Sequence, residues 1–253
     1  MSQTIDIFGA FAPAYTISNE NQRWATNAVS NVQRALTVAG SGDQAIFYRI
    51  NGAKHIDTFD ITNNARVIQD IKFVAIKNLT QQEYYNLIID LFYSANIKKI
   101  PVMRDILPLL PDETMKIINT NGNSNLFGAG LDARHYPENI PSPTEYQELK
   151  SQLQKPFNFV QCDLGDLNAK ISGRYDLINI SNIFDYCYDG QTQAKILYKL
   201  SSNLHIGGYI VYLPQVQRFN YEKLRIATDK IELKYAKTIE HNRSTMILFQ
   251  RTR

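Results

Sequence analysis

Short apolar runs alternate with segments of helical periodicity along most of this chain. Runs of this length, bounded by Gly, Asn and Asp residues, are typical of buried strands. Strands separated by helices predict an α/β fold with a mostly parallel sheet, and the last two runs, joined by the turn-like sequence HNRS, predict an antiparallel C-terminal hairpin. The expected strands are residues 35–39, 55–59, 157–162, 177–180, 209–213, 231–239 and 245–250.

Apolar residues at helical spacing predict the helices between these strands. In one such segment Val67, Ile71 and Val74 lie on a single stripe. Lys72 is one position off this stripe, so we expect its side chain to be solvated or to extend along the surface. Residues 1–34 are expected to form a helical N-terminal arm that packs on the sheet edge, in preference to a lid over a cofactor. The expected helices are residues 19–35, 44–50, 63–77, 81–94 and 191–204, with a Gly-Gly turn after the last.

Residues from about 81 to 155 interrupt the alternation of strands and helices. Three prolines break the segment PVMRDILPLLPDETM, and the segment NTNGNSNLFGAG has the composition of a surface loop. We interpret the block as a helical insertion between the second and third strands. Loops on a rigid scaffold often bind ligands, so the insertion is the expected source of acceptor specificity.

Composition limits the function classes. The 44% of hydrophobic residues suffice for a sizeable core in one domain over residues 1–253. Lys and Arg exceed Asp and Glu by only 27 to 24 and are scattered, so we expect no nucleic-acid partner. The N-terminal sequence MSQTIDIFGAFAPAY has no basic region followed by a long apolar segment, which predicts a cytoplasmic protein without a transmembrane segment. Cys162, Cys187 and four scattered histidines form no metal-ligand or nucleophile pattern.

A glycine-rich turn follows the first expected strand. Gly40, Ser41 and Gly42 allow a tight turn with a close backbone approach, and Asp60 ends the second strand twenty residues after Gly40. This spacing is typical of nucleotide-cofactor folds, in which the carboxylate meets a ribose above the turn. No Gly-Lys-Ser or Gly-Lys-Thr follows, which excludes a Walker loop. Ala45 stands where a nicotinamide fingerprint has its third small residue, so the turn alone leaves that cofactor open.

The succession of polar strand ends narrows the cofactor. With Asp163 after a later strand, an apolar strand that ends in Ser-Asn and the terminal hairpin, the chain from about residue 35 to 253 resembles class I S-adenosylmethionine (SAM) dependent transferases. The resemblance implies a Rossmann-like sheet of seven strands, SAM as cofactor, the glycine turn under its methionine half, Asp60 on the ribose and Asp163 on the adenine amino group. The implied cofactor-binding residues are Gly40, Ser41, Gly42, Asp43, Gln44, Asp60, Ile61, Cys162, Asp163, Leu164, Ser181 and Asn182.

Four local segments look like a narrower family. GSGDQAI, GAKHIDTFDI, IKFVAIKNLTQQEYYNLI and YDLINISNIFDY resemble, in this order, the uncharacterised proteins related to the SAM:diacylglycerol 3-amino-3-carboxypropyl transferase of betaine-lipid synthesis. That family moves the aminocarboxypropyl chain of SAM rather than its methyl group. The resemblance therefore implies that a different bond of the sulfonium is broken.

One position departs from ordinary methyltransferases. Many of them carry an acid two residues before the first glycine, which holds the methionine ammonium, and here that position is Val38. Asp43 and Gln44 supply polar groups on the far side of the turn. We interpret this as a different pose of the methionine tail that presents its γ-carbon to a nucleophile. The alternative is that Asp43 only caps the following helix.

Candidates for catalysis lie after the Ser-Asn strand end. Sulfonium chemistry needs mainly alignment, removal of a proton and aromatic faces near the cation. The sequence FDYCYD is the richest polar cluster in the chain, although a plain loop with two half-buried tyrosines has the same composition. The candidates are Asn182, Asp185, Tyr186 and, from the arm, Tyr15, with Tyr188 as a further aromatic residue.

Three functions are compatible with these features. The leading one is transfer of the aminocarboxypropyl group to a small-molecule or lipid nucleophile, or its cyclisation to azetidine-2-carboxylate without any acceptor, with release of methylthioadenosine. The second is a SAM-dependent methyltransferase with a small-molecule acceptor. The third is a non-catalytic module that keeps the fold to bind a partner.

Overall fold

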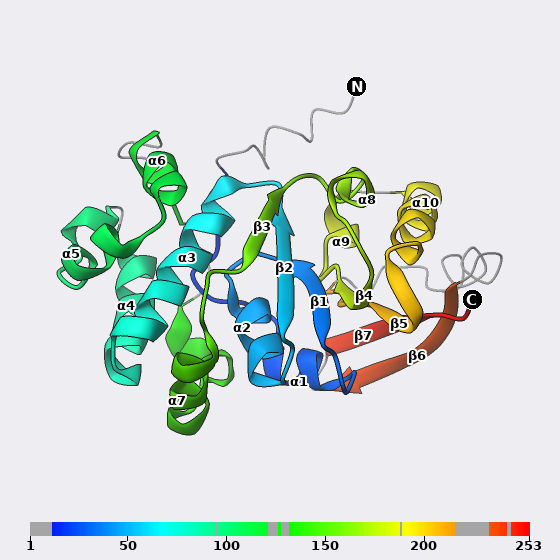
Figure 1. Ribbon diagram of the computed structural model, residues 1–253, viewed down its shortest axis with the longest axis horizontal. Coiled ribbons are helices and arrows are strands. Elements are labelled where there is room, and N and C mark those ends of the chain that lie inside the picture. The colour runs from blue at the N-terminus through cyan, green and yellow to red at the C-terminus, as the bar shows by residue number, and fades with distance from the viewer. Residues whose placement is uncertain are drawn as a thin grey trace.

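The computed structural model describes residues 12–94, 96–120, 126–127, 132–187, 189–215, 233–241 and 244–253. Within these residues seven strands form one sheet in the order β3-β2-β1-β4-β5-β7-β6 (Figure 1). Strand β7 is antiparallel to both of its neighbours, and all other pairs are parallel. The predicted Rossmann-like sheet with an antiparallel C-terminal hairpin is thereby confirmed. The strands are β1 (Arg34–Val38), β2 (His55–Asp60), β3 (Asn158–Gln161), β4 (Tyr175–Asn179), β5 (Leu204–Tyr212), β6 (Leu233–His241) and β7 (Ser244–Arg251).

The strand order places a crevice at the centre of the sheet. The chain runs outward from β1 through β2 to β3 and then returns to the other side of β1, where β4 pairs with it. The connections that leave β1 and β4 therefore diverge. Ligands of open α/β sheets bind outside the carboxyl ends of the strands at such a point.

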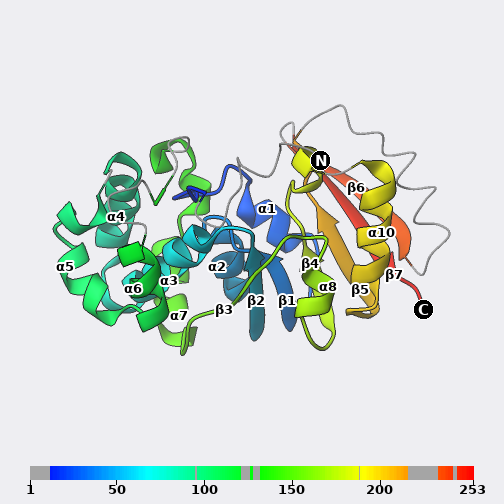
Figure 2. The same cartoon turned by 90° about the horizontal axis from the view of Figure 1, so that it is seen from above.

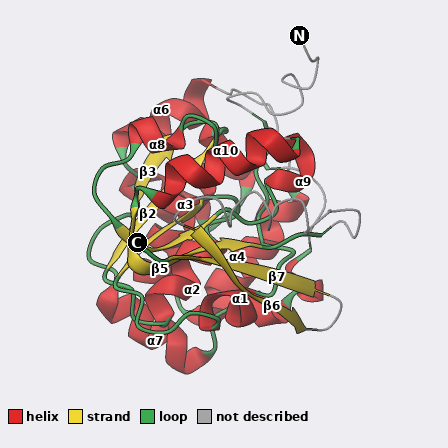
Figure 3. Ribbon diagram, turned by 90° about the vertical axis from the view of Figure 1, so that its right-hand side faces the viewer, coloured by secondary structure: helices red, strands yellow, loops and turns green. Residues whose placement is uncertain are grey.

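Helices cover both faces of the sheet. Figure 3 shows α1, α2 and α7 on one face and α8, α9 and α10 on the other. The helices α3 to α7, which follow β2 and precede β3, gather beside the β3 edge in Figures 1 and 2. Helices α4 to α7 lie within residues 81–155, where the helical insertion was expected, and α3 is the separate helix expected over residues 63–77. The helices are α1 (Gln22–Asn27), α2 (Asp43–Ile50), α3 (Asn63–Asn78), α4 (Gln81–Tyr93), α5 (Met103–Ile106), α6 (Asp112–Thr120), α7 (Pro143–Gln152), α8 (Leu167–Lys170), α9 (Phe184–Cys187) and α10 (Gly190–Ser201).

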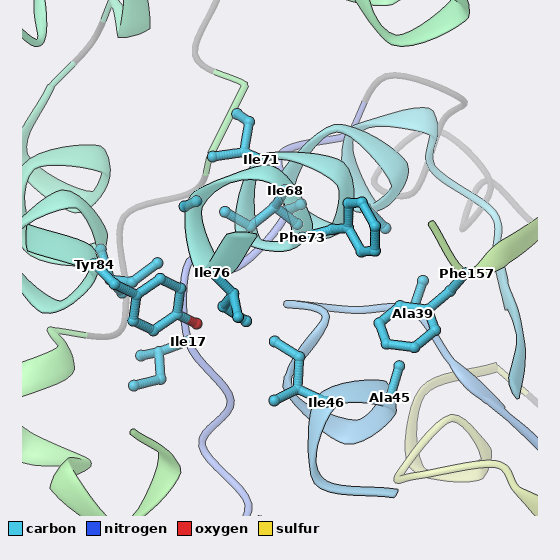
Figure 4. Close-up of a cluster of buried hydrophobic side chains, with 14 of the residues drawn as sticks. Ile17, Ala39, Ala45, Ile46, Ile68, Ile71, Phe73, Ile76, Tyr84 and Phe157 are labelled. Atoms are coloured by element: carbon cyan, nitrogen blue, oxygen red, sulfur yellow. The ribbon is translucent and has the colours of Figure 1, made fainter. Parts of the chain in front are cut away.

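The arm before α1 is part of the hydrophobic core. Ile17 is fully buried and belongs to the same cluster as the apolar stripe of α3. Figure 4 shows it beside Tyr84 of α4 and on the same side of the cluster as Ile76. Burying an isoleucine side chain contributes roughly 1.5–3 kcal/mol to stability. Because Ile17 packs beside α4, the arm contacts the insertion as well as the sheet edge.

The predicted helix over residues 19–35 is wrong in its length. Helix α1 starts only after Asn21, whose side chain accepts a hydrogen bond from the Trp24 N–H, and ends at Asn27. Asn31 has a φ of 60°, a left-handed conformation that Asn tolerates better than most residues and that ends regular helix. The residues before α1 are held instead by hydrogen bonds to distant segments.

The predicted turn at Gly207 and Gly208 is also wrong. Helix α10 ends at Ser201, and β5 starts at Leu204 and contains both glycines. They lie where the pairing of β4 and β5 shifts register, and Gly207 has a φ of 85°. A β-bulge favours glycine for this reason, so the pair marks an irregularity inside a strand rather than its beginning.

No helix in the described part of the chain is both long enough and apolar enough to span a bilayer. Tyr188, residues 1–11 of the arm and most of the NTNGNSNLFGAG segment lie outside the described residues. That the whole chain acts as a single cofactor-binding domain stays a prediction.

Candidate cofactor-binding site

A cavity of about 250 Å³ opens at the carboxyl ends of β1, β2, β3 and β4. Its position is the one expected from the strand order. Five segments contribute to its wall: the arm, the turn after β1, and the ends of the next three strands. The lining residues are Ala12, Pro13, Ala14, Tyr15, Ser18, Asn19, Glu20, Val38, Ala39, Gly40, Ser41, Gln44, Phe59, Asp60, Ile61, Thr62, Cys162, Asp163, Leu164, Ser181, Asn182, Ile183 and Tyr186.

The two glycines of the turn have different tasks. Both have a positive φ, 47° at Gly40 and 83° at Gly42. A Cβ atom on Gly40 would meet no atom within 4 Å, so the bare backbone there borders open space in the cavity. A Cβ atom on Gly42 would lie 3.2 Å from the Cα atom of Gln69. The first glycine thus permits close approach of a ligand, and the second permits close packing of the turn on α3.

Asp60 joins the end of β2 to the glycine turn. One of its carboxylate oxygens accepts a hydrogen bond of 2.9 Å from the Gly40 N–H, and the other accepts one of 3.1 Å from the Thr62 N–H. Burial raises the pKa of Asp60, and the bonds from these backbone groups oppose that rise. Each oxygen keeps acceptor capacity for a further donor, such as a hydroxyl group of a ligand.

The ends of β3 and β4 form the opposite wall. Asp163 accepts a 2.7 Å hydrogen bond from the Gly165 N–H, and burial raises the pKa of the neighbouring Cys162 thiol to about 11, which keeps the thiol protonated at neutral pH. Ser181 has a φ of 50°, which is uncommon outside glycine. The side-chain amide of Asn182 lies 3.3 Å from the Tyr186 hydroxyl group, so these two candidates for catalysis meet at the cavity wall.

Glu20 is a site residue that the sequence analysis missed. Its carboxylate accepts hydrogen bonds from the Ser181 hydroxyl group and, at 2.8 Å, from the Gln44 side-chain amide. Burial raises the pKa of Glu20, and the bond from Ser181 is the largest opposing effect. Nothing in the local sequence pattern of the arm distinguishes Glu20 from its neighbours. The one indication that an acid from another segment was needed is that Val38 stands where many methyltransferases have an acid.

Asp43 and Lys72 form a buried ion pair beneath the turn. Each residue is only 1% exposed, so the prediction of a solvated or surface-lying Lys72 is wrong. The reason is that the glycine turn brings Asp43 over α3, where its charge compensates the buried ammonium group. Asp43 also accepts bonds of 2.7 Å from the Ser18 N–H and 2.8 Å from the Ser41 hydroxyl group. It is the first residue of α2 and not its cap, which is Gly42.

The structure brings most of the sequence-predicted residues together, although their roles stay predictions. Gly42, the last residue of the turn, and Asp43, the first residue of α2, do not line the cavity. Asp185 is also absent from the lining, because its carboxylate accepts hydrogen bonds from the Tyr212 hydroxyl group and the Gln215 N–H. The predicted residues on the cavity wall are Tyr15, Gly40, Ser41, Gln44, Asp60, Ile61, Cys162, Asp163, Leu164, Ser181, Asn182 and Tyr186.

The charges of the wall are of one sign. Glu20, Asp60 and Asp163 line the cavity, and its described lining includes no Lys, Arg or His residue. A cavity with carboxylates and no cation raises the local concentration of positively charged ligands and disfavours free anions. Together with the open backbone at Gly40, this wall suits a ligand that combines hydroxyl groups with positive charge.

No family model matches the chain, and no curated protein matches it. Similar solved structures include the rRNA methyltransferase aviRa from Streptomyces viridochromogenes, with a TM-score of 0.48 and 11% identity over 95% of this chain and 87% of that one. The N-methyltransferase NodS from Bradyrhizobium japonicum, in complex with S-adenosyl-L-homocysteine, has a TM-score of 0.45 and 9% identity over 92% and 84%. Magnesium protoporphyrin IX methyltransferase from Synechocystis, with bound SAM, has a TM-score of 0.43 and 10% identity over 91% and 74%. These likenesses concern the fold alone.

Proposed function

We propose that the chain binds SAM in the cavity between β1 and β4 and uses it as the donor in a transfer reaction. The observation that supports this best is the wall itself, which combines the open backbone at Gly40, the half-buried carboxylate of Asp60 and an excess of negative charge. A sulfonium with an ammonium group and a ribose diol matches that set of groups. In this proposal Asp60 holds the ribose and Asp163 the adenine amino group.

SAM supplies an activated leaving group, so the protein has to align the acceptor and exclude competing nucleophiles. Tyr15, Asn182 and Tyr186 are the residues proposed for this part of the site. The rings of Tyr15 and Tyr186 are half exposed, at 51% and 52%, and both line the cavity, which leaves their faces accessible to a cation or an acceptor. Asp185 has no such position and is proposed to hold the loop after β5.

Methyl transfer to a small molecule is the first candidate reaction. The strand order and the acid at the end of β2 fit class I SAM-dependent transferases as a whole, whereas only four short segments of sequence support the narrower family. Aminocarboxypropyl transfer, or cyclisation to azetidine-2-carboxylate, is the second candidate. It is favoured by one specific observation, which is that Val38 lies at the cavity wall where many methyltransferases have an acid.

Calorimetric titration with SAM tests the proposal directly. We expect the wild-type protein to bind SAM with a dissociation constant below about 1 mM, the weakest affinity in the usual range for enzyme substrates. Asp60→Asn is expected to weaken binding by roughly 10- to 100-fold, because it removes a charged hydrogen-bond acceptor. Asp90→Asn, on the exposed face of α4, is the matched control. Absence of SAM binding by the folded wild-type protein would refute the proposal.

The nucleoside product separates the candidate reactions. The protein is incubated with SAM alone, with a small-molecule fraction and with a lipid fraction of a cell extract, and the products are separated by chromatography. S-adenosylhomocysteine identifies methyl transfer, and methylthioadenosine identifies cleavage of the aminocarboxypropyl chain. SAM binding without either product supports the third candidate, a binding module.

A further inference from the structure

We propose that Glu20 of the N-terminal arm binds the amino group of the cofactor's methionine part, and that the insertion fixes its position through Asn139. The proposal rests on SAM binding in the cavity. It assigns to a residue outside the sheet the task that an acid at position 38 would have. Three independent observations support it: the place of the carboxylate, its charge environment and the way in which the arm is held.

Glu20 lies between the two strands that border the crevice. One carboxylate oxygen accepts a bond from the Ser181 hydroxyl group after β4, and the other accepts a 2.8 Å bond from the Gln44 amide in α2. Gln44 in turn accepts a bond from the Thr37 hydroxyl group within β1. Glu20, Gln44 and Ser181 all line the cavity. The carboxylate therefore lies at the cavity wall between the start of α2 and the end of β4, on the side where the methionine half of SAM is expected.

Among the residues that the structure describes, no cation compensates the charge of Glu20. No Lys, Arg or His residue in the described part of the chain forms an ion pair with it. Its described partners, Ser181, Gln44 and Gln22, are all neutral donors. A carboxylate that is partly removed from water needs an opposite charge to stay ionised at low cost. An ammonium group of a ligand supplies that charge, and a ligand without one leaves the carboxylate uncompensated.

Asn139 holds the backbone on both sides of Glu20. Its side-chain amide donates bonds of 2.8 Å to the Ser18 carbonyl group and 2.7 Å to the Glu20 carbonyl group, and its side-chain oxygen accepts a 2.9 Å bond from the Gln22 N–H. Asn139 belongs to the insertion and is 0% exposed. The Ser18 N–H is fixed separately by Asp43 below the turn. The arm is thus held from two sides, which positions the Glu20 side chain before a ligand arrives.

A purely structural role for Glu20 makes a different prediction. If the carboxylate only fastens the arm to Gln44 and Ser181, its loss weakens the binding of every nucleoside alike, because the wall as a whole is loosened. If it binds the amino group, its loss penalises only ligands that carry this group. The comparison of S-adenosylhomocysteine with methylthioadenosine separates the two, because methylthioadenosine lacks the whole aminocarboxypropyl chain.

The experiment is calorimetric titration of SAM, S-adenosylhomocysteine and methylthioadenosine into the wild-type protein, Glu20→Gln and the control Glu138→Gln. Glu138 is close in sequence to Asn139 but does not line the cavity. For Glu20→Gln we expect roughly 10- to 100-fold weaker binding of SAM and S-adenosylhomocysteine, and less than about a threefold change for methylthioadenosine. A carboxylate on the ligand would be repelled by Glu20, so a selective loss of this size identifies the amino group.

Three outcomes would overturn the inference while leaving SAM binding intact. They are equal weakening of all three ligands, no weakening at all, and weakening of SAM alone, which would assign Glu20 to the sulfonium. Failure of the wild-type protein to bind any of the ligands would instead remove the proposed function together with the inference. If Glu20→Gln shows no cooperative unfolding transition, Glu20→Asp replaces it. This variant keeps the charge but retracts it, and selective weakening of S-adenosylhomocysteine by at least several-fold is required.

Discussion

The buried pair of Lys72 and Asp43 allows a quantitative test of how the cavity floor is built. Lys72→Met keeps an unbranched apolar side chain of similar size and removes the ammonium group. Both side chains are almost completely buried, with exposed fractions of 1% for Lys72 and 2% for Asp43. The variant therefore leaves Asp43 as a buried carboxylate beneath the glycine turn.

The remaining partners of Asp43 set the expected magnitude. Removal of one member of a buried ion pair costs roughly 3–5 kcal/mol. Asp43 keeps bonds from the Ser18 N–H and the Ser41 hydroxyl group, which partly solvate its charge. We therefore expect the lower end of the range, about 3 kcal/mol, which is a large part of the roughly 5–15 kcal/mol of a typical domain.

Urea unfolding followed by circular dichroism measures these differences. The double variant Lys72→Met/Asp43→Asn should recover part of the lost stability, because it removes the unpaired charge. Lys116→Met, at an exposed position of α6, is the control and should stay within about 0.5 kcal/mol of the wild type. A loss below about 1 kcal/mol for Lys72→Met, or a double variant no more stable than the single one, would refute the reasoning.

Three further predictions concern the turn, the arm and the cavity. Gly42→Ala should lower the free energy of unfolding by about 1–3 kcal/mol in urea titrations, because its φ is 83° and a Cβ atom would lie 3.2 Å from the Gln69 Cα atom; a neutral effect would contradict this. Asn139→Ala should increase protease cleavage within residues 12–22 and weaken S-adenosylhomocysteine binding in parallel, and unchanged cleavage would argue against its role in holding the arm. Burial raises the pKa of Glu20, so an ammonium group that binds to its carboxylate should release a proton at a pH near that pKa. The release is measured as a dependence of the calorimetric enthalpy of S-adenosylhomocysteine binding on the buffer, and Glu20→Gln should reduce it.

Local pattern was sufficient for the framework of the site. Gly40, Gly42 and Asp60 could be placed from the sequence because each follows directly from a strand end, and strand ends are set by short apolar runs. The resemblance to SAM-dependent transferases implied that Asp60 and Asp163, which are distant in the chain, lie in one site, and parallel strands bring their carboxyl ends to one edge of a sheet. The strand order observed in the structure agrees with that expectation.

Contacts between segments far apart in sequence escaped prediction. Glu20 meets Ser181 across 161 positions, and Asn139 meets the Glu20 carbonyl group across 119. Periodicity indicates which face of an element is apolar, but it contains no information on which polar partner a loop will meet. The prediction for Lys72 was wrong for the same reason. A lysine beside an apolar stripe is solvated unless a carboxylate from a distant segment, here Asp43, forms an ion pair with it.

The segment that carries the acid proposed to bind the ammonium group determines which parts of the protein respond to cofactor binding. An acid at position 38 would belong to β1 and would be placed by the sheet alone. Glu20 is instead placed by Asn139 of the insertion and, through Ser18, by the floor beneath the turn. A cofactor that binds Glu20 stabilises the state in which the arm contacts the insertion. The free energy of this stabilisation equals the difference between the cofactor's binding free energies for the states with and without that contact. Because Tyr15 of the same arm lines the cavity, such docking would also complete the wall next to the proposed acceptor.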